Sequence, residues 1–261
     1  MTIIVVSDQH LGYQNADKQS FNSFLEDLRG QADITDLVLL GDVVDMWRRD
    51  ASGVFLENKD TLDAIGRLGQ KMNVHYVAGN HDYHVLQLKN HSYPFEFLEN
   101  LTLTESNRTL RFLHGYEFDA MQEPALMEAL CRVMSDGAGS FESGAWATLT
   151  RDWGNLQFFS SLFFRKREIR KKVEGLQVRP EDRLKGTLGG VERLACSSVM
   201  PGETLVFGHT HRPFVNKSEN VVNSGSWVTD APVHNTYVRI EAGKPRLFVY
   251  GGDEITQREE C

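Results

Sequence analysis

Near the C-terminal end of the sequence, "ETLVFGHTHRPF" places His209 and His211 directly after an apolar run that stops at a glycine. Imidazole nitrogens are common ligands of divalent transition metals. In an extended chain, side chains at positions i and i+2 share a face. The spacing therefore predicts that both imidazoles point into one pocket, and the same reasoning applies to Asp8 and His10 in "SDQH".

The same arrangement recurs along the chain, because five apolar, β-branched runs each end in residue types that bind metals. These runs are 3–10, 37–45, 74–82, 110–115 and 204–211. Runs that are apolar at nearly every position predict strands buried on both faces. Ligands of open α/β sheets bind beyond the carboxyl ends of the strands. We therefore expect the five strand ends to gather these side chains into one metal site.

Helical periodicity fills the segments between the first three predicted strands. It is present in 20–30, "SFNSFLEDLRG", and in 58–70, "NKDTLDAIGRLGQ". Strands that alternate with helices predict an α/β fold.

The composition bounds the class of protein. The 261 residues carry a formal net charge of −8, and 41% are hydrophobic, which is ordinary for a soluble globular protein. The net charge disfavours nucleic acid as a partner held by an overall positive field. Cys131, Cys196 and Cys261 form no CxxC pair, so they indicate neither a disulfide framework nor a thiolate zinc site and favour a reducing cytoplasm. The start "MTIIVVSDQHLG" predicts a first strand rather than a signal peptide.

The polar residues at the strand ends form an ordered series of motifs. In chain order these are Asp8-x-His10, Gly41-Asp42-x-x-Asp45, Gly79-Asn80-His81-Asp82, His114 and Gly208-His209-x-His211. The series resembles the calcineurin-like metallophosphoesterase superfamily. The resemblance implies a four-layer αββα sandwich, with two mixed sheets flanked by helices and a dinuclear metal centre at the strand ends. The core would comprise 1–116 and 201–261.

The resemblance also implies a ligand set. The first metal would be held by Asp8, His10, Asp42 and His211. The second would be held by Asp42, Asn80, His114 and His209, with Asp42 as the bridge. Oxygen and nitrogen donors without thiolate suit Mn²⁺, Fe or Zn²⁺ better than Cu(I), and imidazole-rich sites suit Mg²⁺ less. We expect two divalent ions per chain, Mn²⁺ first, with Fe or Zn²⁺ as alternatives.

A two-metal centre lowers the pKa of bound water and clamps the oxygens of an in-line displacement. We therefore expect hydrolysis of a phosphodiester or pyrophosphate bond by a metal-activated hydroxide. His81 is the expected general acid or hydrogen-bond donor at the leaving oxygen. Asp45 or Asp82 would orient His81 or a ligand histidine, and the alternative for Asp82 is a helix N-cap. Alternative functions are a nuclease-type phosphodiesterase, a phosphomonoesterase or a non-catalytic protein-binding scaffold.

Two further residues are candidates for substrate contact. Arg48 would hold a substrate phosphate, and its alternative is an exposed loop charge. Asn223 would lie close to the substrate, and its alternative is a β-turn built on Gly225. The stretches "SDQHLG" and "GDVVDMW" resemble the UDP-diacylglucosamine pyrophosphohydrolase-like subgroup, in which an aromatic residue follows the second motif. Those enzymes generally have arginine where this chain has His81. We therefore expect the substrate to be either a phosphorylated small molecule or a lipid-linked one.

Residues 117–200 lack strand-like runs and predict helices, which we interpret as an inserted helical cap over the active site. Within them, 158–172 reads "FFSSLFFRKREIRKK". The favoured interpretation of this stretch is a core-facing helix with a solvated basic end. The alternatives are a peripheral membrane or acyl-chain surface, an anionic partner and a homodimer contact.

Overall fold

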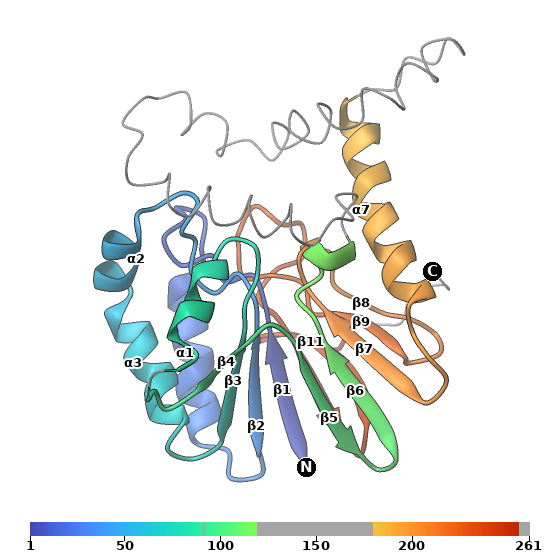
Figure 1. The fold of residues 1–261 in the computed structure, drawn as a ribbon, viewed down its shortest axis with the longest axis horizontal. Coiled ribbons are helices and arrows are strands. Elements are labelled where there is room, and N and C mark those ends of the chain that lie inside the picture. Colours follow the sequence, from blue (N-terminus) through green and yellow to red (C-terminus); the bar gives the residue numbers. More distant parts are fainter. Residues whose placement is uncertain (91, 119–179, 256–261) are drawn as a thin grey trace.

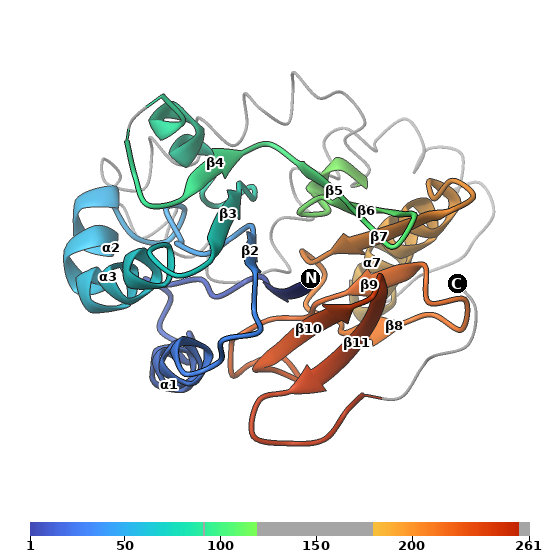
Figure 2. The same ribbon diagram turned by 90° about the horizontal axis from the view of Figure 1, so that it is seen from below.

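Four layers of secondary structure make up the part of the chain that the computed structural model describes, residues 1–90, 92–118 and 180–255. Two mixed sheets lie face to face, with α1, α2 and α3 on one side and α7 on the other (Figures 1 and 2). The predicted α/β sandwich of two mixed sheets flanked by helices is confirmed.

The first sheet has the strand order β11-β10-β1-β2-β3-β4. Its strands are β1 (Thr2–Val6), β2 (Asp36–Leu40), β3 (Asn73–Val77), β4 (Glu96–Leu98), β10 (Thr236–Glu241) and β11 (Lys244–Val249). Strands β1 to β4 are parallel, whereas β10 is antiparallel to both of its neighbours. The helices between the parallel strands are α1 (Lys18–Arg29), α2 (Ala51–Glu57) and α3 (Lys59–Leu68).

The second sheet has the order β5-β6-β7-β9-β8. Its strands are β5 (Leu101–Glu105), β6 (Arg108–Phe112), β7 (Glu203–Phe207), β8 (Phe214–Val215) and β9 (Val221–Asn223). The three inner strands are parallel and the two edge strands are antiparallel to them. Helix α7 (Pro180–Ser197) covers this sheet, and the short 3₁₀ helices are η1 (Tyr83–Leu88) and η2 (Tyr116–Phe118).

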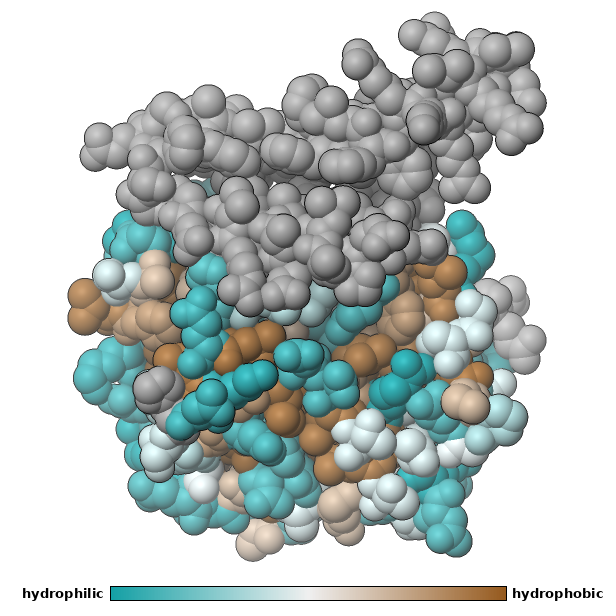
Figure 3. Space-filling view, in the orientation of Figure 1, coloured by the Kyte–Doolittle hydropathy of each residue, from teal (hydrophilic) through white to brown (hydrophobic). Residues whose placement is uncertain are grey.

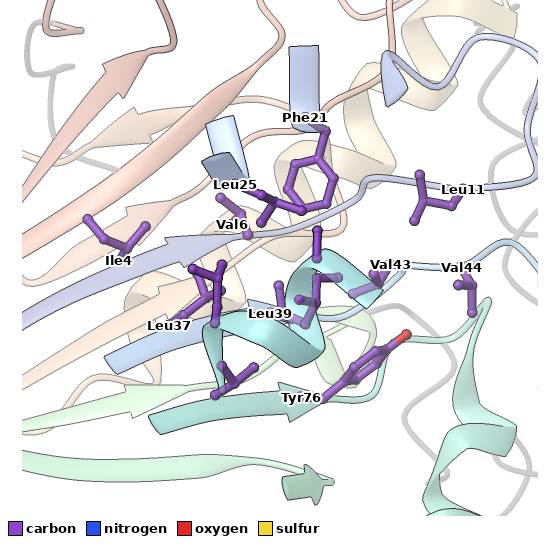
Figure 4. Packing of buried hydrophobic residues seen from close by; sticks show 14 of the residues in the cluster. Ile4, Val6, Leu11, Phe21, Leu25, Leu37, Leu39, Val43, Val44 and Tyr76 are labelled. Atoms are coloured by element: carbon purple, nitrogen blue, oxygen red, sulfur yellow. The ribbon is translucent and has the colours of Figure 1, made fainter. Parts of the chain in front are cut away.

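Successive residues of β1 point into two different apolar clusters. Ile4 and Val6 face the helices and join the cluster that contains Phe21 and Leu25 of α1 (Figure 4). The intervening residues of β1 join the cluster between the two sheets. A strand has a side-chain period of two, so an apolar run without alternation is what a strand covered on both faces requires.

A third apolar cluster fixes α7 to the second sheet. Val191 and Ala195 of α7 pack with Leu205 and Phe207 of β7.

The face shown in Figure 3 carries hydrophilic side chains interspersed with apolar ones. Residues 119–179 of the predicted cap, including the stretch 158–172, lie outside the described residues, so the domain boundaries stay a prediction.

Two further findings concern the chain as a whole. Cys196 of α7 is disulfide-bonded, which the scattered cysteines did not indicate, and its partner lies outside the described residues. None of the helices in the described ranges is long and apolar enough to cross a bilayer.

Every predicted strand ends earlier than its apolar run suggested. The run 3–10 forms a strand only to Val6, and the run 204–211 only to Phe207. The metal-binding residue types therefore lie in loops that begin where the strands stop. The strands position the site through the loops that follow their last residues, and none of the candidate ligands lies within a strand.

Leu39→Ala is expected to lower the free energy of unfolding by about 3–5 kcal/mol, because the Leu39 side chain is fully buried in β2 next to the site. Urea denaturation followed by circular dichroism measures this loss. The matched control is Leu56→Ala in α2, where Leu56 is 77% exposed, and a change within about 0.5 kcal/mol is expected. Equal losses in the two variants would contradict the assignment of the core.

Candidate metal centre

The candidate ligands follow the strands at a constant interval. In four loops the first ligand stands two residues beyond the last strand residue: Asp8 after β1, Asp42 after β2, His114 after β6 and His209 after β7. Backbone hydrogen bonds join these loops in pairs. The amide of Asp8 donates to Gly41 O (3.0 Å), and the amide of Gly208 donates to His114 O (2.8 Å). Each of these bonds joins two loops of the same sheet, and the amide of His209 donates to Asp8 Oδ2 (3.0 Å), which connects the loops of the two sheets.

The backbone at the site is left-handed rather than extended. The residues Asp8, His10, Asp42, His209 and His211 have φ angles of 56°, 48°, 53°, 65° and 54°. Such conformations cost non-glycine residues about 1–3 kcal/mol each and persist only where the surroundings impose them. The extended-chain reasoning for the two histidine motifs is therefore wrong, since turns of the backbone aim these side chains. His211 joins Asp8 and His10, whereas His209 joins a separate group.

Glycines in the motifs allow the loops to approach closely. A Cβ atom at Gly79 would overlap the Asp42 side chain, and one at Gly41 would overlap the His114 ring. A Cβ at Gly208 would meet Asp8 at 2.5 Å. The glycines that precede Asp42, Asn80 and His209 are thus required because a ligand from another loop occupies the space that a side chain would need.

The first group of ligands consists of Asp8, His10 and His211. His211 Nε2 lies 3.2 Å from Asp8 Oδ1 and 3.1 Å from His10 Nε2. His10 Nε2 lies 3.7 Å from the same Asp8 oxygen. Asp8 and His10 are buried, whereas the His211 side chain is 14% exposed. The three ligand atoms converge closely enough to hold one ion.

Asp42, His114 and His209 form the second group. His114 Nε2 lies 3.2 Å from Asp42 Oδ2, and that same oxygen lies 3.8 Å from His10 Nε2 in the first group. Asp42 therefore occupies the position expected of a bridging carboxylate. The Asn80 side-chain oxygen is buried and has no hydrogen-bond partner among the described residues, so it is available as a further metal ligand.

Hydrogen bonds behind the rings determine which nitrogen faces the site. His114 Nδ1 donates to the carbonyl oxygen of Leu40 (2.8 Å), which can only accept. His10 Nδ1 donates to Asp45 Oδ2 (3.1 Å). Nε2 of each ring therefore faces the centre and would carry the lone pair when the ring is neutral, as in metal-binding histidines whose other nitrogen is held by a second group.

The electrostatics of the centre favour added positive charge. Burial by itself lowers the pKa of both ligand histidines with resolved shifts, but neighbouring carboxylates outweigh it. Asp45 and Asp8 raise the pKa of His10 to about 9, and Asp42 and Asp8 raise the pKa of His114 to about 10. Burial opposes ionisation of Asp8 and Asp42, yet the imidazoles hold the pKa of each well below its usual range. Buried carboxylates with nitrogen donors around them fit divalent metal ions.

His81 stands beside the first group. Its Nδ1 donates to Asp45 Oδ1 (2.9 Å), and its ring stacks on the indole of Trp47 at 4.1 Å between centroids. The His81 backbone amide donates to Asp42 Oδ1 (2.8 Å). Burial lowers the pKa of His81, although Asp45 and Asp42 act against it. Asp45 thus orients His81 as well as the ligand His10, and of the two predicted carboxylates it is the one that does so.

Asp82 instead joins two motif loops. Its carboxylate accepts hydrogen bonds from the amides of Val43 (2.8 Å) and Gly79 (2.6 Å) and from the hydroxyl of Tyr76 (2.7 Å). Asp82 stands at the N-cap position of η1, as one alternative expected, but its side chain makes no cap hydrogen bond there. Burial, together with the charge of Asp42, raises the pKa of Asp82 to about 6.

The Asn223 side chain makes its hydrogen bonds within the protein, to the loop of His209 and to its own turn. Its Nδ2 donates to Gly208 O (2.8 Å) and Thr210 Oγ1 (3.0 Å), and its Oδ1 accepts from the Gly225 amide (2.8 Å). The side chain is fully buried, and Gly225 has φ 79°. The structure therefore supports the turn interpretation, with Asn223 bracing the loop of His209.

Arg48 is not the exposed loop charge that was one alternative. Its side chain is 12% exposed and forms an ion pair with Asp45. Its guanidinium lies 4.4 Å from the centroid of the Tyr13 ring. Sequence reasoning did not predict the roles of Tyr13 or of Trp47, because a ring that stacks on a distant polar group leaves no periodicity or spacing in the sequence.

The chain is thus an α/β sandwich of two mixed sheets, and the histidine and carboxylate groups that follow its strands are consistent with a dinuclear metal site. The chain belongs to the calcineurin-like phosphoesterase family, which matches residues 1–213. No curated protein matches this chain.

Several solved structures resemble the chain at low identity. The phosphoesterase YfcE from E. coli is 18% identical, with 99% of this chain and 98% of that chain covered and a TM-score of 0.50. An archaeal phosphodiesterase is 13% identical over 95% and 99% of the two chains, with a TM-score of 0.45. Zn²⁺-complexed Vps29 from Entamoeba histolytica is 15% identical over 95% and 89%, with a TM-score of 0.39. At such identity the likeness to YfcE concerns the fold alone.

Asp42→Asn is expected to reduce the occupancy of both metal positions, because the Asp42 carboxylate lies between the two groups. Mass spectrometry of the metals retained after gel filtration measures the stoichiometry. Asp63→Asn on the surface of α3 makes the same charge change away from the centre and should retain the wild-type metal content. Two ions at full occupancy in Asp42→Asn would refute the bridge.

Proposed function

We propose that this chain is a metal-dependent phosphoesterase that hydrolyses a phosphodiester or pyrophosphate bond. The observation that carries the proposal is the pair of buried ligand groups that share Asp42, with His81 held beside them. Two bound divalent ions would supply Lewis acidity toward the phosphate and would lower the pKa of a nucleophilic water. The family to which the chain belongs supports this chemistry.

The proposed ligand set follows the two groups of side chains. The first position comprises Asp8, His10, Asp42 and His211. The second comprises Asp42, Asn80, His114 and His209. Nitrogen and oxygen donors without thiolate favour Mn²⁺, with Fe and Zn²⁺ as alternatives.

His81 is the proposed proton donor to the leaving oxygen. Asp45 accepts from Nδ1, and the stack on Trp47 fixes the plane of the ring. With Nδ1 bonded to Asp45, the proton given to the leaving oxygen would come from Nε2 of the doubly protonated ring, a form that the charges of Asp45 and Asp42 favour and burial opposes. A donor whose ring is fixed before the substrate arrives loses less entropy in the transition state.

The substrate class follows from the charge of the chain and of the centre. A net charge of −8 favours a phosphorylated small molecule or a lipid-linked pyrophosphate over nucleic acid. A nuclease-type activity is the second candidate. The cytoplasmic location that the scattered cysteines favoured stays a proposal, and the disulfide of Cys196 argues against a reducing compartment.

The first test compares a diester with a monoester. Metal-stripped protein would be reloaded separately with Mn²⁺, Zn²⁺, Fe²⁺ or Mg²⁺ and assayed on bis-p-nitrophenyl phosphate and p-nitrophenyl phosphate. We expect metal-dependent cleavage of the diester, fastest with Mn²⁺. Preference for the monoester would replace the proposal with a phosphatase. Silence with every metal, although two ions are bound, would favour a non-catalytic scaffold.

His81→Ala is expected to keep both metal ions but to lower kcat about 100-fold or more, because general acid catalysis commonly contributes 10²–10⁴-fold. The matched control is His75→Ala in β3, since His75 pairs with Asp36 at the start of β2 and not with the centre. Steady-state kinetics and metal analysis would be measured together. Loss of the metals in His81→Ala would show that His81 is a ligand instead.

A further inference from the structure

One cationic side chain, that of Arg48, contacts the centre through the Asp45 carboxylate. The Arg48 guanidinium lies between the face of the Tyr13 ring, at 4.4 Å, and the Asp45 carboxylate, with which it forms an ion pair. A guanidinium stacks well on an aromatic face while its edge donates hydrogen bonds. The contact therefore fixes both the plane and the edge of the guanidinium.

Tyr13 is itself held in place. Its hydroxyl donates to Asp230 Oδ2 (2.8 Å), and the side-chain amide of Asn15 donates to the Tyr13 hydroxyl (2.9 Å). The amide of Asn15 also reaches Asp230 (3.2 Å). The ring under Arg48 is thus fastened to a loop that follows β9, far away in the sequence.

The Asp45 carboxylate must satisfy two imidazoles at once. Oδ2 accepts from His10 Nδ1 and from Arg48, whereas Oδ1 accepts from His81 Nδ1. The backbone amides of Trp47 (3.2 Å) and Arg48 (3.0 Å) also donate to Oδ1. Oδ1 therefore has backbone donors that belong to its own turn. Oδ2 has Arg48 as the donor that opposes a rotation of the carboxylate away from His10.

We propose that Arg48 is a positioning residue: through Asp45 it sets the orientation of the His10 and His81 rings, and Tyr13 keeps its guanidinium in place. The kinetic part of this inference rests on the proposed function, whereas the part that concerns metal affinity does not. Arg48 thereby acts on one ligand ring and on the proton donor together, through the carboxylate that both rings share.

The geometry favours this role over capture of a substrate phosphate. Arg48 directs Nη1 at Asp45 and covers one face with Tyr13, and its side chain is 12% exposed. The neighbouring Arg49 is 43% exposed and pairs with Glu57 at the surface. The two adjacent arginines therefore form a matched pair for an experiment.

The experiment compares Arg48→Gln with Arg49→Gln, which make the same change in charge. Mn²⁺ affinity would be measured by competition with a fluorescent chelator, and kcat and KM would be measured on bis-p-nitrophenyl phosphate. For Arg48→Gln we expect Mn²⁺ affinity and kcat each to fall about 10- to 100-fold with KM unchanged, the usual effect of removing a group behind a ligand. Arg49→Gln should match the wild type, and Arg48→Lys should recover part of both losses.

Two results would overturn the inference. A raised KM with kcat and metal affinity unchanged would make Arg48 a substrate-binding residue, and wild-type values throughout would leave it without a role in the centre. Thermal unfolding would check that the variants are folded. If Arg48→Gln is not folded, Tyr13→Leu removes the stacked ring and leaves the ion pair, and a smaller loss of the same two quantities is expected. A wild-type protein without hydrolysis would refute the proposed function, while metal affinity would still decide the role of Arg48.

Discussion

The Asp42 side chain is the point at which the loops of this protein meet, and the rest of the centre depends on it. One carboxylate oxygen accepts the His81 amide, and the other lies 3.2 Å from His114. The Asp42 backbone carbonyl accepts the amide of His10 (2.8 Å). Loops from three other strands are therefore fastened to one residue, which is itself buried and left-handed. The chemical groups are brought together by hydrogen bonds within the chain itself.

An arrangement of this kind is unfavourable on its own. It combines left-handed backbone at five residues with buried carboxylates that repel one another. The two sheets stabilise this arrangement, because the strands that lead into the site are buried on both faces and remain ordered up to their last residues. Strands β1 and β2 have no exposed residue, and their last residues lead directly into the turns at Asp8 and Asp42. Stability gained from the apolar clusters is thus used to hold strained and charged loops in one position.

Much of the architecture was predictable from the sequence, since apolar runs without alternation mark strands with two covered faces, and helical periodicity marks α1 and α3. The gathering of ligands at the strand ends was also predictable. The direction of each side chain was not. An apolar run does not show where a strand stops, so the extended-chain reasoning placed His209 and His211 in one pocket, and only the family resemblance assigned them to different metals. Left-handed turns at both residues produce the division that the resemblance implied. The roles of Asp82 and Arg48 depend on contacts with Tyr76 and Tyr13, which no local pattern encodes.

The constant two-residue interval between strand end and ligand restricts changes in chain length more than changes in side chain. A residue inserted between Phe207 and His209 would rotate the turn away from His114 and would separate the loop from its partner. Beyond the ligands no such restriction holds, because the next motif is positioned by its own strand. The long stretch of chain between His114 and β7 lies in such an interval. In this chain an insertion after a ligand is therefore expected to disturb the site less than one between a strand end and its ligand.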